Sequence, residues 1–214
     1  MRRIRFRIVV LAAVIAAAAP IRAEVIDRIL AVVDAQVITL SDARAALRFR
    51  LVPEDVSVDP IAAALQRLID RRLMLADVDR YAPPEPLPAA VDAAIAEIER
   101  RFKDTLEMEI AITQSGITRD ELRRYLRDSL RIETYLQQRF PPAVQPSEDE
   151  IVRYYREHAS EFTVAGGLKP LDDVREAARA GAVRAQREAL VRQWVEGLRR
   201  RGAVQVLYLP AAGK

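Results

Sequence analysis

Side chains that commonly carry catalysis are scarce in this 214-residue chain, which has one histidine and no cysteine. Without cysteine it forms no disulfide, no thiolate nucleophile and no cysteine-based zinc site. A serine–histidine–aspartate triad would have to use His158. That residue lies in a polar segment at the expected end of a helix, where a solvated histidine is the ordinary role. The residue types therefore predict no catalytic residue.

The acidic run Glu148-Asp149-Glu150 is the next candidate, because neighbouring carboxylates can hold a metal ion. It directly follows Ser147, and the order Ser-x-x-Glu is a capping box that starts a helix. Acids in a first turn also interact favourably with the helix dipole. We therefore expect a helix start and no metal site. Gly166-Gly167 stands alone and forms no phosphate-binding loop, so the sequence predicts no cofactor.

The net charge of +3 comes from the N-terminal segment. Five of the 34 basic residues lie in the first 23 positions, which contain no acid: Arg2, Arg3, Arg5, Arg7 and Arg22. The rest of the chain carries 29 basic residues against 31 acidic ones. This balance gives no electrostatic case for a nucleic acid partner.

Residues 1–23 have the layout of a secretory signal peptide. Arginines precede an apolar run of 12 residues, Ile8–Ala19, and the bond between Ala23 and Glu24 is the expected cleavage site. The run is short for a bilayer span, which needs about 20 residues. Retention as a membrane anchor is the alternative. We expect an exported protein of the periplasm, with no stable membrane insertion after cleavage.

Local patterns predict two strands followed by helices. β-Branched residues indicate a hairpin of Arg28–Val33 and Val37–Thr39. Apolar residues then recur at helical spacing behind typical helix starts. The expected helices begin at Ser41, at Pro60 behind Asp59, at Pro88 (continuing to Gln114), after Thr118 and after Ser147, and the last runs from Leu171 to Arg201.

Val204–Leu209 has the composition of a terminal strand, and a lone strand would leave its backbone groups unpaired. Joining the N-terminal hairpin in one small sheet would pair it. The sequence therefore predicts a mostly α-helical, α+β protein. The expected divisions are a signal peptide at 1–23, a helical module with the opening hairpin at 24–140, a short helix and loop at 141–170, and a closing helix and strand at 171–214 that pack back on the module.

This order of segments resembles the SurA-type periplasmic chaperones. Ile26–Val33 followed by Val37–Asp42 is similar to the family's opening hairpin and capped first helix, although the turn between them lacks the family's usual Asn or Gly. Leu65–Ala76 is similar to its second helix. The closing helix with Trp194, Leu198 and Arg199, followed by Val204-Gln205-Val206, completes the resemblance. It implies the family's helical chaperone module, which holds unfolded exported polypeptides without ATP.

The chain departs from the family pattern where a parvulin-type prolyl isomerase domain usually lies. Glu150–Phe162 resembles the lead-in to such a domain and Leu171–Val183 the lead-out, but only eight residues, Thr163–Pro170, separate them. A domain needs roughly 50 residues. The family's isomerase site also uses a histidine pair with an acidic residue or cysteine. We therefore expect no enzyme activity.

A chaperone without ATP has to hold its clients on exposed apolar surface, preferably in a concavity. Outer-membrane proteins suit such a surface because their strands carry many apolar and aromatic residues. The candidate client contacts are Leu47, Phe49, Leu51, Tyr81, Phe102, Met108, Ile112 and Tyr125. Core packing is the alternative for each, and full burial is least expected for Phe49 and Tyr81 beside polar or proline-rich loops. Trp194, in phase with Leu190 and Leu198, is expected in the core.

Two other functions stay open. The same apolar surface would serve a structural or adaptor subunit of a cell-envelope complex, which binds one fixed partner. A residual prolyl isomerase is the second alternative, and it would need a desolvated proline pocket.

Overall fold

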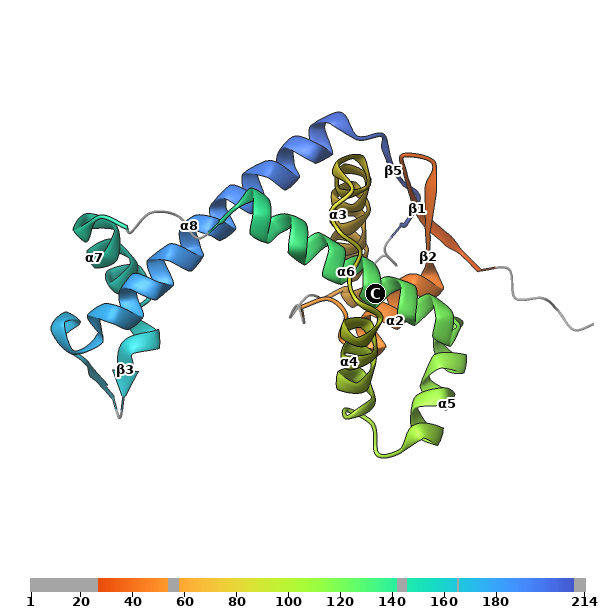
Figure 1. Ribbon diagram of the computed structural model, residues 1–214, viewed down its shortest axis with the longest axis horizontal. Helices are drawn as coiled ribbons and strands as arrows, with labels where there is room; N and C mark the ends of the chain where they lie inside the picture. Colours follow the sequence, from red (N-terminus) through yellow and green to blue (C-terminus); the bar gives the residue numbers. More distant parts are fainter. Residues whose placement is uncertain (1–26, 54–57, 142–145, 165, 210–214) are drawn as a thin grey trace, which may run out of the picture.

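The computed structural model describes residues 27–53, 58–141, 146–164 and 166–209 (Figure 1). The predicted signal peptide and its cleavage site at Ala23-Glu24 lie outside these residues. Helices dominate, with a small three-stranded antiparallel sheet and a separate two-stranded one, which confirms the predicted fold class of mostly α with a small sheet. The elements are β1 (Ile29–Val33), β2 (Gln36–Thr39), α2 (Leu40–Arg48), α3 (Pro60–Tyr81), α4 (Pro88–Glu99), α5 (Thr105–Ser115), α6 (Arg119–Arg139), α7 (Glu148–Glu157), the 3₁₀ helix η1 (Ala159–Phe162), β3 (Thr163–Val164), β4 (Gly167–Leu168), α8 (Leu171–Arg201) and β5 (Val204–Val206).

The sheet joins both ends of the described chain, as predicted. Its strand order is β2-β1-β5, and both pairings are antiparallel. Asp34 and Ala35 connect β1 and β2 with positive φ angles of 46° and 65°, the combination that two-residue hairpin turns require. The Asp34 N–H donates to the Ala203 carbonyl (3.0 Å), and the Asp34 carboxylate accepts from the Ala203 N–H (2.9 Å). The residue in front of β5 therefore helps to hold the turn. β5 itself is shorter than the predicted Val204–Leu209.

Local capping signals place most helix starts. α3 begins at Pro60, and the Asp59 side chain caps it by accepting the Ala62 N–H. Capping boxes open α6 at Thr118 and α7 at Ser147. The expected start at Ser41 is wrong by two residues. Thr39 is the cap, and its hydroxyl and the Asp42 carboxylate form a further capping box.

The single helix expected from Pro88 to Gln114 is wrong, because the structure has two helices there. α4 ends at Glu99, and Asp104 caps α5 by accepting the Glu107 N–H at 2.8 Å. A good cap inside an apolar pattern thus starts a new helix, since it satisfies a backbone donor that a continuous helix would have used. Gly116, at φ 74°, ends α5 as predicted.

Two adjoining clusters of buried side chains form the body of the molecule. The larger lies under the sheet and joins α2, α3, α6 and the second half of α8, with Leu30, Ile69 and Trp194 among its members. The smaller joins α2, α4, α5 and α6 around Phe49, Met108 and Leu122. Trp194 is 8% exposed, which confirms its predicted place in the core.

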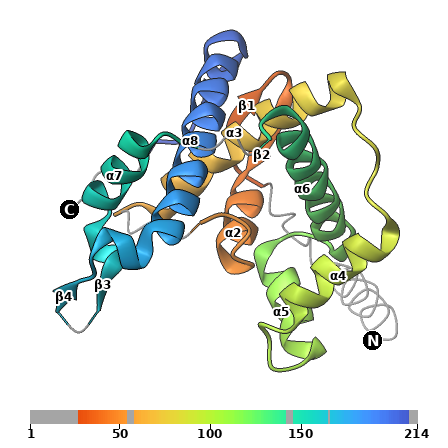
Figure 2. The ribbon, with the colours of Figure 1, turned by 60° about the vertical axis from the view of Figure 1, so that its left-hand side comes forward.

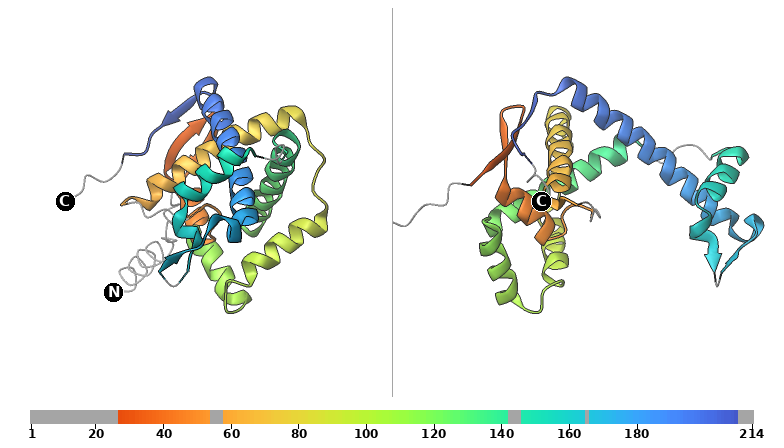
Figure 3. Two further views of the ribbon diagram at one scale, coloured as in Figure 1. Left: turned by 90° about the vertical axis from the view of Figure 1, so that its left-hand side faces the viewer. Right: turned by 180° about the vertical axis from the view of Figure 1, so that it is seen from behind.

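A third cluster lies apart, in a region that we call the distal lobe: α7, η1, β3, β4 and residues 171–185 of α8. Figures 1 and 3 show this lobe projecting to one side of the body, with α8 running through both. Gly181 allows the close contact, because a Cβ there would lie 2.1 Å from the Tyr154 ring. The loop expected at 165–170 instead contains the two-residue strand β4, which pairs with β3 (Figure 2).

Candidate functional site

An apolar groove of about 550 Å³ lies between α3, α6 and α8, on the body of the molecule. It is open to solvent, and the segment that follows α2 closes one side. Its apolar lining residues are Leu51, Val52, Pro53, Met74, Ile132, Leu136, Val191 and Val195. The other lining residues are Tyr125, Ser129, Arg67, Asp70, Arg71, Arg192, Glu196 and Arg199. An apolar floor inside a charged rim is the usual composition of a binding cleft.

The groove exists because α3, α6 and α8 each contribute a row of side chains at helical spacing. On α6, Tyr125, Ser129, Ile132 and Leu136 follow one another at helical spacing. On α8, Val191 and Val195 lie one turn apart. Both valines pack partly against the main core and keep the rest of their surface in the groove. Ordinary core-forming patterns therefore supply its walls.

Arg71 and Tyr125 form one end of the groove. The Arg71 guanidinium lies over the Tyr125 ring, with 3.7 Å between its carbon and the ring centroid. It donates to the Tyr125 backbone carbonyl (2.6 Å) and to the Ser129 hydroxyl (3.0 Å). The Tyr125 hydroxyl donates to the Leu51 carbonyl at 3.3 Å. Burial raises the pKa of the Tyr125 phenol, which stays protonated and keeps this contact at neutral pH.

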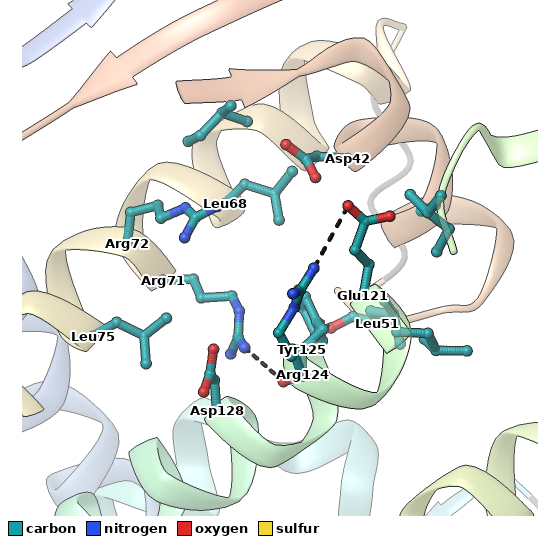
Figure 4. A pocket seen from close by; sticks show the side chains of 14 residues that line it. Asp42, Leu51, Leu68, Arg71, Arg72, Leu75, Glu121, Arg124, Tyr125 and Asp128 are labelled. Carbon is teal, nitrogen blue, oxygen red and sulfur yellow. Dashed lines mark hydrogen bonds and ion pairs between the residues drawn. The ribbon is translucent and has the colours of Figure 1, made fainter. Parts of the chain in front are cut away.

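A second hollow of about 290 Å³ lies on the other side of this end wall, and it shares Leu51, Arg71 and Tyr125 with the groove. Figure 4 shows its charged side chains gathered from α2, α3 and α6. Three are basic and three acidic: Arg71, Arg72, Arg124, Asp42, Glu121 and Asp128. Arg124 and Glu121 lie 3.7 Å apart as an ion pair. The exposed lining of this hollow is about evenly polar and apolar, whereas that of the groove is mostly apolar.

Two of the eight predicted contact residues, Leu51 and Tyr125, line the groove. Leu47 packs half-buried against the main core. Tyr81 is 60% exposed, as its place beside a proline-rich loop suggested, and its ring packs on Tyr135 at 5.5 Å. It lies outside the groove lining.

The expected exposure of Phe49 is wrong. Phe49 is 1% exposed, because Phe102 packs on its ring at 5.8 Å and the Arg101 guanidinium covers its carbonyl at 3.0 Å. Both covering residues lie in the connection between α4 and α5, far along the chain. Met108 and Ile112 are buried in the same cluster, and Phe102 is half-buried against it. These four residues do not meet the groove.

Most groove residues were not among the predicted client contacts. These residues include Met74, Ile132, Leu136, Val191 and Val195. A signal was present on α6, whose apolar residues fall on more than one face. One face fills the smaller cluster through Leu122 and Leu126, and another reaches the groove through Ile132 and Leu136. The pattern showed two contact faces, but it did not show that one of them stays open.

The remaining candidates for chemistry have structural roles. His158 caps α7, where its ring stacks on Tyr154 at 4.0 Å and its Nδ1 lies 3.0 Å from the Tyr154 carbonyl. Glu150 accepts the Ser147 N–H in the capping box at 2.8 Å, and Glu148 pairs with Arg175 at 2.6 Å. In the described ranges, no three histidine, aspartate or glutamate side chains lie together as a metal ligand set would. No helix in those ranges has the length and apolar character to cross a membrane.

Comparison with known proteins supports the fold. No family model and no curated protein matches the sequence. A solved structure does match, from a study of the virulence factor PEB4 and the periplasmic protein Cj1289, two structurally related SurA-like chaperones of Campylobacter jejuni. The match covers 85% of this chain and 100% of the other, with 13% sequence identity and a TM-score of 0.50. The chain therefore has a SurA-like fold, which confirms that part of the resemblance.

Proposed function

We propose that this protein is an ATP-independent chaperone that holds unfolded exported polypeptides in the groove between α3, α6 and α8. The observation that carries the proposal is the groove itself: an open apolar hollow on a stable helical body, in a fold shared with SurA-like chaperones. Apolar concavities of this kind mark binding surfaces, because burying that surface in the monomer would otherwise have been favourable.

Holding would use many weak contacts. Each large apolar side chain of a client that enters the groove gains roughly 1.5–3 kcal/mol. Met74 at the floor is flexible and adapts to clients of different shape. A few such contacts hold a client segment in the groove. When the client folds, the segment becomes buried inside the client and leaves the groove. No nucleotide is needed for this exchange.

Outer-membrane proteins are the proposed clients. Their strands present lipid-facing apolar and aromatic residues that stay exposed until membrane assembly. The proposed location is accordingly the periplasm, after cleavage between Ala23 and Glu24. The protein would act without isomerase activity, since it has a single histidine and no cysteine for the family's isomerase site.

The first test is suppression of aggregation. The full chain is expressed with its own N-terminus and purified as the cell processes it, and mass spectrometry tests for a mature start at Glu24. A urea-denatured outer-membrane β-barrel is then diluted into buffer without ATP, and light scattering is followed. Suppression near one-to-one stoichiometry is the expected result. No suppression at large excess would contradict the proposal and favour a dedicated partner instead.

A pair of matched variants assigns the activity to the groove. Val195→Glu places a carboxylate on the apolar wall, and suppression should fall severalfold. Leu106→Glu makes the same change at an apolar side chain of α5 that is 69% exposed and outside the groove, and it should leave suppression unchanged. Equal loss in both variants would count against the groove.

The two alternative functions have their own readouts. One partner that co-purifies in fixed stoichiometry would indicate an adaptor subunit, whereas several substoichiometric clients would indicate a chaperone. Clear acceleration in a protease-coupled prolyl isomerase assay would support the residual prolyl isomerase alternative. We expect no acceleration.

A further inference from the structure

The rim of the groove carries an excess of positive charge. Four arginines line it, Arg67, Arg71, Arg192 and Arg199, against Asp70 and Glu196. This excess contrasts with the chain beyond residue 23, where acids slightly outnumber bases. The surroundings of the groove are therefore electrostatically distinct from the molecule as a whole.

Existing ion pairs do not remove this excess. Asp70 is held by Arg199, which also contacts Gln66. Arg192 lies 3.8 Å from Glu188, an exposed pair one helical turn apart whose contribution is small. Once Asp70 and Arg199 are matched, three arginines face the single carboxylate of Glu196.

Arg71 differs from exposed Arg67 and Arg192 because it is partly buried and its direct partners are neutral. Its guanidinium is half-buried at the end wall and bonds to neutral groups, the Tyr125 carbonyl and the Ser129 hydroxyl. Among the described residues, no carboxylate lies within ion-pair distance of it. Asp128 acts only at longer range, because its own ion pairs are with Arg127 and Arg131. Burial lowers the pKa of Arg71, although a guanidinium stays charged at neutral pH.

A partly desolvated cation with neutral partners gains more from an incoming carboxylate than an exposed one does. A guanidinium has five N–H donors, and the bonds to Tyr125 and Ser129 engage two of its nitrogens. The apolar floor reaches this wall through Leu51 and Ile132. A client segment in the groove thus brings the residues beside its apolar run close to Arg71.

We propose that the groove selects apolar client segments flanked by acidic residues, with Arg71 as the principal carboxylate contact and Arg67 and Arg192 as supporting charges. The proposal rests on the proposed chaperone function and names the chemistry of its clients. Segments flanked by lysine or arginine should be disfavoured by the same charges.

The test uses two fluorescein-labelled peptides with the same apolar core, one flanked by glutamates and one by lysines. Binding to the full, natively processed protein is followed by fluorescence anisotropy. At low ionic strength the acidic peptide should bind about tenfold more tightly, as expected for a charge-assisted contact of this class. The preference should shrink as salt is raised, because the rim charges are partly exposed.

Three variants test which arginines cause the preference for the acidic peptide. Arg71→Gln should remove most of it, and circular dichroism checks that the variant is folded. The double variant Arg67→Gln/Arg192→Gln changes only exposed side chains, so it should fold and reduce the preference severalfold. Arg200→Gln removes an exposed arginine of α8 that does not line the groove, and it should have no effect.

The outcomes separate this inference from the proposed function. Equal binding of the two peptides, or tighter binding of the lysine peptide, would overturn the acidic preference and leave the chaperone proposal intact. Failure of both peptides to bind, together with no suppression of aggregation, would overturn both. A preference that survives in both arginine variants would also overturn the assignment to the groove.

Discussion

The two halves of α8 pack in different ways. In the distal lobe the helix presents Ala178, Gly181 and Ala182, and α7 approaches closely enough for the Tyr154 ring to occupy the space of a side chain. In the body the same helix presents Val191, Trp194 and Val195, and an open groove remains beside them. Small residues let two helices close on each other, whereas large ones hold neighbours apart and leave binding surface.

The hollows of the two regions also differ, in the polarity of the side chains that line them. The groove of the body is mostly apolar, while the hollow beside α7 is lined by Asp149, Val152, Arg153, Arg156 and Glu157. An unfolded polypeptide gains free energy by burying apolar surface in the first and little in the second. This difference supports the body as the place of the proposed client holding, and four predictions test the separation of the two regions.

The largest effect is expected for Trp194→Ala in the body. The indole packs on Tyr135 and Phe140, each at 5.7 Å between ring centroids. Its removal should lower the free energy of unfolding by about 3–5 kcal/mol. Suppression of aggregation should fall as well, because α8 carries one wall of the groove. Urea unfolding followed by far-ultraviolet circular dichroism measures the change.

A matched variant controls for α8 itself. Leu190 lies on the same helix but is 43% exposed, so Leu190→Ala should change stability by less than about 0.5 kcal/mol. Equal effects at positions 190 and 194 would show that the body does not depend on this aromatic cluster.

The next effect is expected for Gly181→Ala in the distal lobe. The added Cβ would meet the Tyr154 ring at 2.1 Å, so α7 has to move, at a cost of about 1–3 kcal/mol. Amide hydrogen exchange should accelerate in α7 and leave α3 and α6 protected. Suppression of aggregation should stay at the wild-type level. Its loss would contradict the separation of the two regions.

A smaller effect is expected when equivalent helix caps are removed. Thr118→Ala in α6 and Ser147→Ala in α7 each delete a capping hydroxyl, at about 1 kcal/mol. The first should lower the stability of the body, and the second only that of the lobe. Hydrogen exchange resolves the two, with Thr118→Ser as a control that keeps the cap. Identical exchange patterns in both alanine variants would mean that the two regions unfold as one unit.

The smallest effect is expected from pH. The backbone N–H of Ser147, followed by its hydroxyl, holds the pKa of Glu150 below its usual value. A lowered pKa stabilises the fold at pH above the usual value for glutamate, about 4.3. This stabilisation disappears as the pH falls through the lowered pKa, because the proton then binds the folded state too.

Chemical shifts of the α7 amides measure this dependence during an acid titration. The shifts should report loss of the cap only at acid pH, and Glu150→Gln should remove most of the response. An unchanged titration in that variant would assign the response to the other acids of the first turn, Glu148 and Asp149.

Local signals made much of the fold predictable. The capping boxes at Thr118 and Ser147 and the Asp59-Pro60 start involve residues three or four apart, so sequence alone specifies them. The meeting of the chain ends was predictable for another reason, because a lone strand needs a partner and the hairpin was the available one. The cap at Asp104 was not recognised in the sequence, so one continuous helix was predicted where the structure has two.

The open groove was beyond such reasoning. Phe49 looked exposed because it lies at a helix end, yet Arg101 and Phe102 cover it from 52 and 53 positions along the chain. Glycine is unfavourable inside a helix, but α8 runs through Gly181, where the absence of a side chain makes room for the Tyr154 ring.

The sequence by itself therefore determined most of the helices, several of their caps and the three-stranded sheet. Only the tertiary structure decided which apolar stripes meet and which stay open. The physical reason is that capping and periodicity act between near neighbours, whereas burial depends on partners that are distant in the chain. Val191 and Leu136 carry the same kind of local pattern as buried residues, but the arrangement of α3, α6 and α8 leaves part of their surface in a groove.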